Sequence, residues 1–197
     1  MEIGGWSPGM VILDAMEKAA DVSVIQAELN DQPGVCLKLA GNLGDVRAAA
    51  DAARAMARQL AVQIVVDVIA SPDPRSVPAY HAAPDFNPLI EQPSVHMPLP
   101  GDTPMSAQAG FAIGFIETQG FTAVFEAIDT AVKTANVEVL AREKLGGGYI
   151  TVVIKGDVAA VRAAVDAGKA KVESLGKLVA AHVIPSPSEG ALSLLPK

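Results

Sequence analysis

The chain has 197 residues, of which half are hydrophobic and 4% aromatic, and its formal net charge is -7. Its 15 basic residues form no stripe of the kind that nucleic-acid binding needs, and no apolar run approaches the roughly 18–20 residues of a membrane span. We therefore expect neither nucleic-acid nor membrane partners. A single cysteine excludes an internal disulfide, and the sequence starts without a signal-peptide pattern, so we expect a cytosolic protein.

Residues 1–72 predict a helix, two strands, a second helix and a closing strand. In chain order these elements span residues 8–20, 22–29, 35–40, 43–60 and 61–70. Asn42 is a suitable cap for the second helix, and a polar turn joins the first two strands. A unit of this size, built from small apolar side chains, has a marginal core, so we expect it to bury surface against another unit or subunit.

Residues 73–109 contain eight prolines and little periodicity, which is typical of a linker. Comparison with the second half of the chain suggests that the first unit lacks its first strand, because that strand would fall before Met1. We expect residues 94–99 of the linker to lie as an edge strand in the missing position.

Residues 110–190 predict the order strand, helix, strand, strand, helix, strand, and residues 191–197 form a tail. The elements span residues 110–117, 121–135, 137–144, 149–155, 158–175 and 178–184. Gly146, Gly147 and Gly148 between the two middle strands indicate a tight hairpin turn that needs positive φ. Asp157 is a suitable cap for the second helix.

The two units match one another without a gap at an offset of 115 residues. Identical residues include Glu2 and Glu117, Gly5 and Gly120, Asp14 and Asp129, Lys18 and Lys133, and Gly41 and Gly156. A repeat of this length indicates a duplicated domain, because solenoid and propeller repeats run at roughly 20–50 residues. We call residues 1–72 the first copy and residues 110–190 the second copy.

The second copy resembles a known domain along its whole length. Its motifs are, in order, Ile116-Glu117-Thr118-Gln119-Gly120, Glu143-Lys144-Leu145-Gly146-Gly147-Gly148, Val153-Ile154-Lys155-Gly156-Asp157 and His182-Val183-Ile184-Pro185. They resemble the bacterial microcompartment shell domain, and the more diverged first copy keeps the same phase. The resemblance implies an α/β (α+β) fold of two tandem domains, each a small, mostly antiparallel sheet with helices in unpermuted order. Tandem-domain shell proteins assemble as trimers shaped like hexamers.

The resemblance also implies a central pore, since six domains around a three-fold axis would bring their strand-to-strand turns together. The pore-lining residues would be Asn30, Asp31, Gln32 and Pro33 in the first copy and Leu145, Gly146, Gly147 and Gly148 in the second. Three copies of Asp31 would favour small neutral or cationic metabolites over bulky anions. A plain tight hairpin is the alternative for the glycines, whereas a phosphate loop would precede a helix.

Lys18 and Lys133 end the first helix of each copy, where a cation interacts favourably with the helix dipole. The resemblance implies instead that they lie at the edge of a hexagonal tile and pack against a neighbour, with Asp21 and Asn136 beside them. Shell domains often carry an arginine at the positions of Ser71 and Ser186, so the edge contacts of this chain can differ in strength or partner.

No catalytic, metal or cofactor site is expected. Some trimeric tandem shell proteins hold an iron–sulfur cluster with pore-loop cysteines, but that ligand position aligns with Gln32, and Cys36 lies inside a strand as a buried thiol. His81, His96 and His182 are too dispersed for a metal site, and we expect His182, in a strand, to be a packed or hydrogen-bonded residue. Other polar residues have no assigned role: Asp14, Asp129, Glu28, Arg142 and Glu143.

The sequence thus predicts a non-enzymatic subunit of a bacterial microcompartment shell, a homotrimeric tile with a central pore. Its partners would be other shell proteins and encapsulated enzymes. The alternative is a regulatory oligomer with an α/β sandwich fold that binds a small molecule with the same loops. Side-by-side hexagonal packing through Lys18 and Lys133 would favour the tile, and a discrete oligomer with tight ligand binding would favour the alternative.

Overall fold

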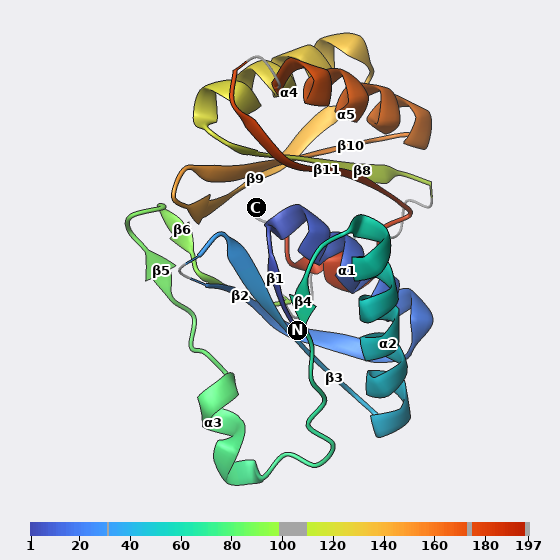
Figure 1. Cartoon of the computed structure of the whole chain (residues 1–197), viewed down its shortest axis with the longest axis vertical. Helices are drawn as coiled ribbons and strands as arrows, with labels where there is room; N and C mark the ends of the chain where they lie inside the picture. Colours follow the sequence, from blue (N-terminus) through green and yellow to red (C-terminus); the bar gives the residue numbers. More distant parts are fainter. Residues whose placement is uncertain (31, 99–109, 173–174, 196–197) are drawn as a thin grey trace.

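In the computed structural model, the first copy forms a five-stranded antiparallel sheet covered by two helices (Figure 1). The structure describes residues 1–30, 32–98, 110–172 and 175–195. The elements of the first copy are β1 (Glu2–Gly4), α1 (Trp6–Ala19), β2 (Val22–Asn30), β3 (Gly34–Gly41), α2 (Leu43–Leu60) and β4 (Ile64–Val65). The sheet order is β4-β1-β3-β2-β7, in which β7 (Val95–His96) belongs to the linker.

The linker carries short elements that run along one side of the molecule (Figure 1). They are the 3-10 helix η1 (Pro74–Ser76), α3 (Val77–Tyr80), the hairpin strands β5 (Phe86–Asn87) and β6 (Gln92–Pro93), and β7. The side chain of Asp73 caps η1 by accepting a hydrogen bond from the Arg75 N–H. The β5–β6 hairpin brings the linker back towards the two large sheets.

The second copy forms a four-stranded antiparallel sheet in the order β11-β8-β10-β9. Its elements are β8 (Ala112–Gln119), α4 (Phe121–Thr134), β9 (Glu138–Gly146), β10 (Tyr149–Gly156), α5 (Val158–Val172), β11 (Lys177–Pro185) and α6 (Glu189–Ser193). These results confirm the predicted α/β fold with antiparallel sheets and the predicted order of its first six elements. Helix α6 was not predicted, and it extends into the residues expected to form a tail.

Small side chains set the spacing between the helices and the sheet in the second copy. A Cβ atom added to Gly168 of α5 would lie 2.5 Å from Ile116 Cδ1 and 2.9 Å from the backbone oxygen of Ala127. Only glycine fits at this crossing of α5 over α4 and β8. Ala123, Ala127 and other alanines fill the remaining interface, so the helices pack closely although the core has few aromatic rings.

The first copy departs from the prediction at its first and last strands. A first strand is present, because β1 lies between β4 and β3, but it has three residues where β8 has eight. β4 pairs only with this short strand, so it forms over two residues instead of the predicted 61–70. The expected linker strand does join this sheet, but β7 pairs with β2 at the opposite edge, and residue 99 lies outside the described part of the chain.

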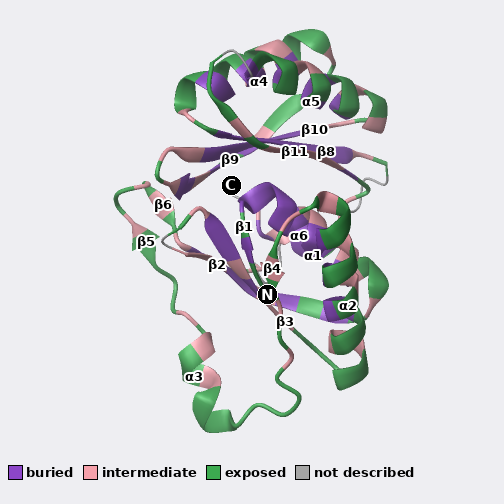
Figure 2. Cartoon of the chain, in the orientation of Figure 1, coloured by how far each residue is buried: buried purple, intermediate pink, exposed green. Residues whose placement is uncertain are grey.

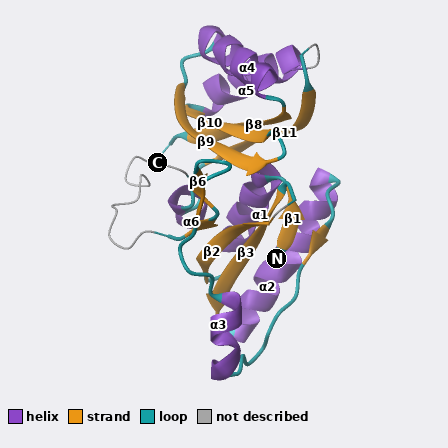
Figure 3. Ribbon diagram, turned by 90° about the vertical axis from the view of Figure 1, so that its left-hand side faces the viewer, coloured by secondary structure: helices purple, strands orange, loops and turns teal. Residues whose placement is uncertain are grey.

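The two copies stack so that α1 lies between its own sheet and the sheet of the second copy (Figures 1 and 3). Trp6 and Met10 of α1 belong to one hydrophobic cluster with Phe115 and Ile184 of the second sheet. Helix α4, the counterpart of α1, packs on one side only and is exposed on the other (Figure 2). The chain therefore already contains one contact between its two domains.

The end of the chain returns to the first copy. Helix α6 packs against α1, and its residue Ala191 and the following Leu194 are buried in the shared core. The Ser188 N–H, at the start of α6, donates a hydrogen bond of 2.8 Å to Asp14 Oδ1 of α1. Among the described helices, none is long and apolar enough to cross a membrane.

Candidate functional site

The hairpin turn of the second copy has the conformation that its glycines predict. Gly146, Gly147 and Gly148 have φ angles of 86°, 59° and 81°, in the left-handed region that side chains disfavour. Gly148 accepts a hydrogen bond of 2.9 Å from the N–H of Gly120, which starts α4. Leu145 is 4% exposed and packs in the shared core. The turn therefore presents bare backbone at its tip.

The turn of the first copy has the same anchor and a different surface. Pro33 accepts a hydrogen bond of 2.8 Å from the N–H of Gly5, which matches the contact between Gly148 and Gly120. Gln32 is exposed, Asn30 donates a hydrogen bond of 2.9 Å to Glu2 Oε1, and Asp31 lies outside the described residues. One turn is thus polar where the other is free of side chains.

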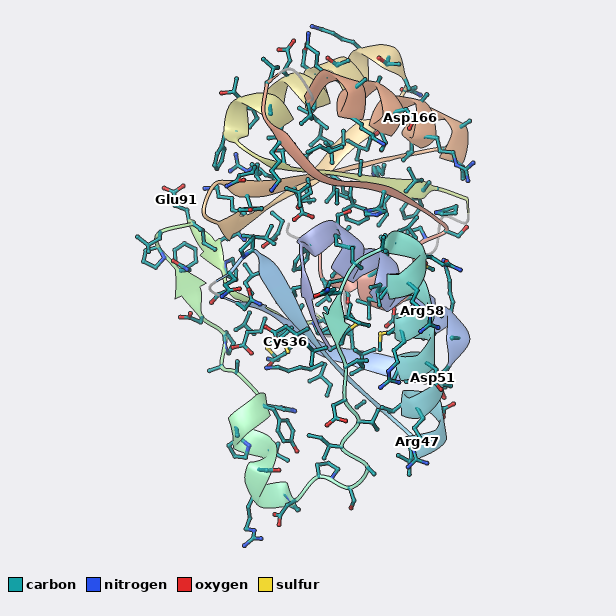
Figure 4. All side chains as sticks on the ribbon, in the orientation of Figure 1. Cys36, Arg47, Asp51, Arg58, Glu91 and Asp166 are labelled. Atoms are coloured by element: carbon teal, nitrogen blue, oxygen red, sulfur yellow. The ribbon has the colours of Figure 1, made fainter. Side chains whose placement is uncertain are left out.

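The linker connects the two hairpins near these turns. The Gln92 side chain pairs with the backbone of Lys144, since its Oε1 accepts from the Lys144 N–H at 2.9 Å and its Nε2 donates to the Lys144 oxygen at 2.7 Å. Two residues later, Ser94 O accepts from the Leu29 N–H of β2 at 2.8 Å. Figure 4 shows Glu91 at the tip of the linker hairpin beside β9, where its carboxylate meets Lys144. We call residues 91–96 the linker clamp.

Two fully buried carboxylates lie between the second sheet and the first copy. Glu117 of β8 accepts hydrogen bonds from the N–H groups of Trp6 at 3.2 Å and Ser7 at 2.9 Å, at the start of α1. Glu143 of β9 contacts His96 Nε2 at 3.2 Å and accepts a hydrogen bond from Gln92. Burial raises the pKa of both carboxyls, although their hydrogen bonds act in the opposite direction.

Histidines complete this buried seam. His96 of the linker packs against Trp6 with ring centroids 5.0 Å apart and ring planes tilted by 55°, and His182 Nδ1 of β11 lies 2.8 Å from Ser7 Oγ. Burial lowers the pKa of His182, and Lys169 lowers it further. The expectation that His182 is a packed or hydrogen-bonded residue is confirmed. Nothing in the sequence indicated that His96 and Glu143 belong to the seam, because their partners come from the other copy or the linker.

The lysines at the helix ends lie in two different environments. Lys18 and Asp14 form an ion pair of 2.7 Å, and Lys18 Nζ also lies 3.5 Å from the Pro185 oxygen of the second copy. Lys133 forms the equivalent ion pair with Asp129 at 2.6 Å, but its side chain is 73% exposed. Asp21 and Asn136 are both exposed.

Cys36 lies on β3 and is half-buried, not fully buried as expected (Figure 4). Within the described residues, no group of three or more histidines, cysteines and carboxylates is arranged to hold a metal ion. The polar groups of the seam contact partners in the other copy or in the linker.

Comparisons with known proteins agree with this architecture. The model of the BMC domain matches the chain twice, at residues 1–73 and 112–187. The bacterial microcompartment shell protein PduA of Citrobacter freundii is 49% identical over 86 residues, which cover 44% of this chain and 92% of PduA. The carboxysome assembly protein CcmO of a Synechococcus species is 32% identical over 184 residues, which cover 93% of this chain and 63% of CcmO.

One solved structure is also similar. A crystal structure of a microcompartments protein from Desulfitobacterium hafniense DCB covers 95% of this chain and 92% of its own length, at 28% identity and a TM-score of 0.39.

Proposed function

The chain belongs to the BMC-domain family, and we propose on this premise that it is a structural, non-enzymatic subunit of a bacterial microcompartment shell. In this proposal the protein lies in the shell, within the cytoplasm. Its partners are further copies of itself, other shell proteins and encapsulated enzymes. Three chains form a ring with a hexagonal outline and a central pore.

The packing of the two copies within the chain is the observation that carries the ring. Helix α1 of the first copy is covered by the sheet of the second copy, which is a contact between two unlike surfaces. Unlike surfaces join copy to copy until the series closes as a ring or extends as a filament. Each chain keeps one open surface of each kind, namely α4 of the second copy and the outer face of the first sheet. Three chains that close in this way form a ring of six domains, two from each chain.

A ring of this kind would turn both hairpin turns towards its axis. The linker clamp supports this arrangement, because it holds the ends of the β2–β3 and β9–β10 hairpins next to each other. The pore would then alternate between polar turns with Asn30, Asp31, Gln32 and Pro33 and backbone turns with Gly146, Gly147 and Gly148. Leu145 would support the second turn from below.

We predict that the pore passes small neutral or cationic metabolites more easily than bulky anions. Three Asp31 carboxylates at one ring of the pore would attract cations. The change Asp31→Asn should lower the cation selectivity of protein layers formed across an aperture, measured as a reversal potential. Gln32→Ala, which removes no charge, serves as the control. Equal selectivity in Asp31→Asn and the unchanged protein would count against a role of Asp31 in the pore.

The tile itself is tested by mass and by packing. Native mass spectrometry should give a particle of three 20.2 kDa chains, and electron microscopy at high concentration should show hexagonal layers. Lys133→Ala should suppress the layers and leave the trimer intact, while Lys177→Ala at the start of β11 should leave both the trimer and the layers intact. A trimer that never forms layers but binds a small molecule tightly would favour the regulatory oligomer.

A further inference from the structure

The start of α4 is an open surface with unused backbone donors. The helix follows Gly120, and no described side chain caps its first N–H groups. Phe121 and Phe125 are 39% and 48% exposed, with their ring centroids 6.0 Å apart. Thr122 between them is exposed as well. Free N–H groups and two exposed aromatic rings at one helix start are typical of a surface that contacts another molecule.

The equivalent end of α1 is fully covered within the chain. Trp6 and Met10, the counterparts of Phe121 and Phe125, are both 0% exposed against the second copy. Glu117 takes the N–H groups of Trp6 and Ser7, and the Ser7 hydroxyl lies 2.8 Å from His182 Nδ1. A Cβ atom at Gly5 would lie 3.2 Å from Glu117 Oε1, so the missing side chain lets the carboxylate approach.

The first copy carries the counterpart of Glu117 on its own open sheet and the counterpart of His182 on the segment that follows β4. These are Glu2 and Asp67, each 115 residues earlier, and both are exposed. Glu2 pairs with Cys36 and Val65 in the sheet as Glu117 pairs with Thr151 and Ala180, so the two carboxylates occupy the same register.

The surroundings of Glu2 fit the same role. Asn30 donates to Glu2 Oε1 and holds the carboxylate in place, which leaves Oε2 free to accept. Val65 and Ile69, on the last segment of the first copy, are 72% and 63% exposed. At Gly120, the counterpart of Gly5, an added Cβ atom would meet nothing within 4 Å, so the space for an approaching carboxylate is open.

We infer that Glu2 of one chain accepts hydrogen bonds from the N–H groups of Phe121 and Thr122 in a neighbouring, identical chain. Asp67 of the first chain accepts the Thr122 hydroxyl, where His182 meets Ser7 within the chain. The rings of Phe121 and Phe125 pack over the same open sheet. The inference rests on the proposed ring. Two carboxylates at one helix start interact favourably with its dipole, so this contact between chains is more sensitive to salt than the contact within the chain.

A cross-linking experiment tests the contact. In a Cys36→Ser background, Asp67→Cys and Thr122→Cys together should react with a short bismaleimide to give covalent dimers and trimers on a denaturing gel. Glu138→Cys with Lys155→Cys is the control, since these accessible positions lie opposite each other within one chain and should give only a shifted monomer. A particle that native mass spectrometry shows as a trimer, but in which the first pair never joins two chains, overturns the inference and leaves the ring standing.

A second measurement does not depend on introduced cysteines. Glu2→Ala should raise the protein concentration at which half of the chains dissociate by about ten-fold, since it removes a charge-assisted hydrogen-bond acceptor. Asp51→Ala removes an exposed carboxylate from α2 and should leave that concentration unchanged. Equal dissociation of the two variants contradicts the role of Glu2. A protein that is monomeric at every concentration removes the proposed ring, and the contact with it.

Discussion

Single buried residues hold the two copies of the chain together. Glu117 is fully buried, and its two hydrogen bonds go to the backbone at the start of a helix in the other copy. A helix start carries partial positive charge and free N–H groups, so a carboxylate offsets part of its own burial cost there. The raised pKa of Glu117 indicates that this compensation is incomplete.

We predict that Glu117→Ala lowers the free energy of unfolding by about 2 kcal/mol, because the N–H groups of Trp6 and Ser7 lose their acceptor in a buried place. Glu117→Gln keeps one acceptor oxygen and should cost less. Chemical denaturation measures the difference. Glu138→Ala, at an exposed ion pair with Lys155, should change stability by less than about 0.5 kcal/mol. A loss as small in Glu117→Ala would contradict the role assigned to this carboxylate.

His182 makes the seam sensitive to pH. Burial lowers its pKa below the ordinary value of 6.5, so the unfolded chain takes up this proton at a higher pH than the folded chain does. The stability that depends on neutral His182 is therefore present above about pH 6.5 and is lost as the pH falls below it.

The melting temperature should show this difference. Between pH 7.5 and 5.5 it should fall more steeply for the unchanged protein than for His182→Gln, which cannot take up the proton. Because Glu117 and Glu143 are present in both proteins, their opposite effect on stability largely cancels in the comparison. Parallel curves would show that His182 takes up its proton equally readily in the folded and the unfolded chain, which would contradict the lowered pKa.

At the residue scale, local sequence predicts local roles and misses contacts between the copies. Three consecutive glycines predicted a turn with positive φ, and the structure confirms it. The identity of Glu2 and Glu117 was visible in the sequence, but nothing near Glu117 indicated that it caps a helix 110 residues away. Such a role depends on how the copies stack, which the sequence alone does not determine.

At the scale of elements, the linker clamp explains how the two copies stay in register. The Gln92 side chain both donates to and accepts from the backbone of Lys144, as a neighbouring strand would. Strand β7 extends the first sheet beside β2. The linker clamp therefore joins two sheets that share no strand. It lies next to the hairpin turns, where a shift of one copy against the other would change the shape of the proposed pore.

We predict that Gln92→Ala weakens the contact between the linker clamp and β9 without unfolding either copy. Amide hydrogen exchange of Lys144 should become about ten-fold faster, because its partly buried backbone N–H loses the hydrogen bond to Gln92, worth about 1.4 kcal/mol. Gln59→Ala on the exposed side of α2 is the control and should leave these rates unchanged. Unchanged exchange at Lys144 in Gln92→Ala would show that the clamp holds without this side chain.

Most elements could be predicted from the sequence, because each copy repeats the same pattern. The helix expected at residues 43–60 is α2, with the same bounds, and the glycine turn separates β9 from β10. The prediction was wrong where an element depends on a partner strand. β4 is short because its partner β1 is short. β7 pairs with β2 at the edge of the sheet, whereas it was expected in the position of the first strand.

At the scale of the whole molecule, the duplication makes two kinds of contact from one. The contact within the chain uses Trp6, Met10 and His182, and the proposed contact between chains uses Phe121, Phe125 and Asp67 at the same positions. Within the chain, the buried Ser7 pairs with His182, whose lowered pKa favours its neutral form. In the proposed contact between chains, Thr122 pairs with the charged carboxylate of Asp67.

A density map of the assembled particle by cryo-electron microscopy tests the central claim most directly. The account predicts three chains around a three-fold axis, six domains in one layer, and α4 of each chain covered by the first sheet of the next. The turns at residues 30–34 and 145–148 should surround the axis. A map in which α4 faces solvent at the perimeter, or in which the turns point away from the axis, would contradict it.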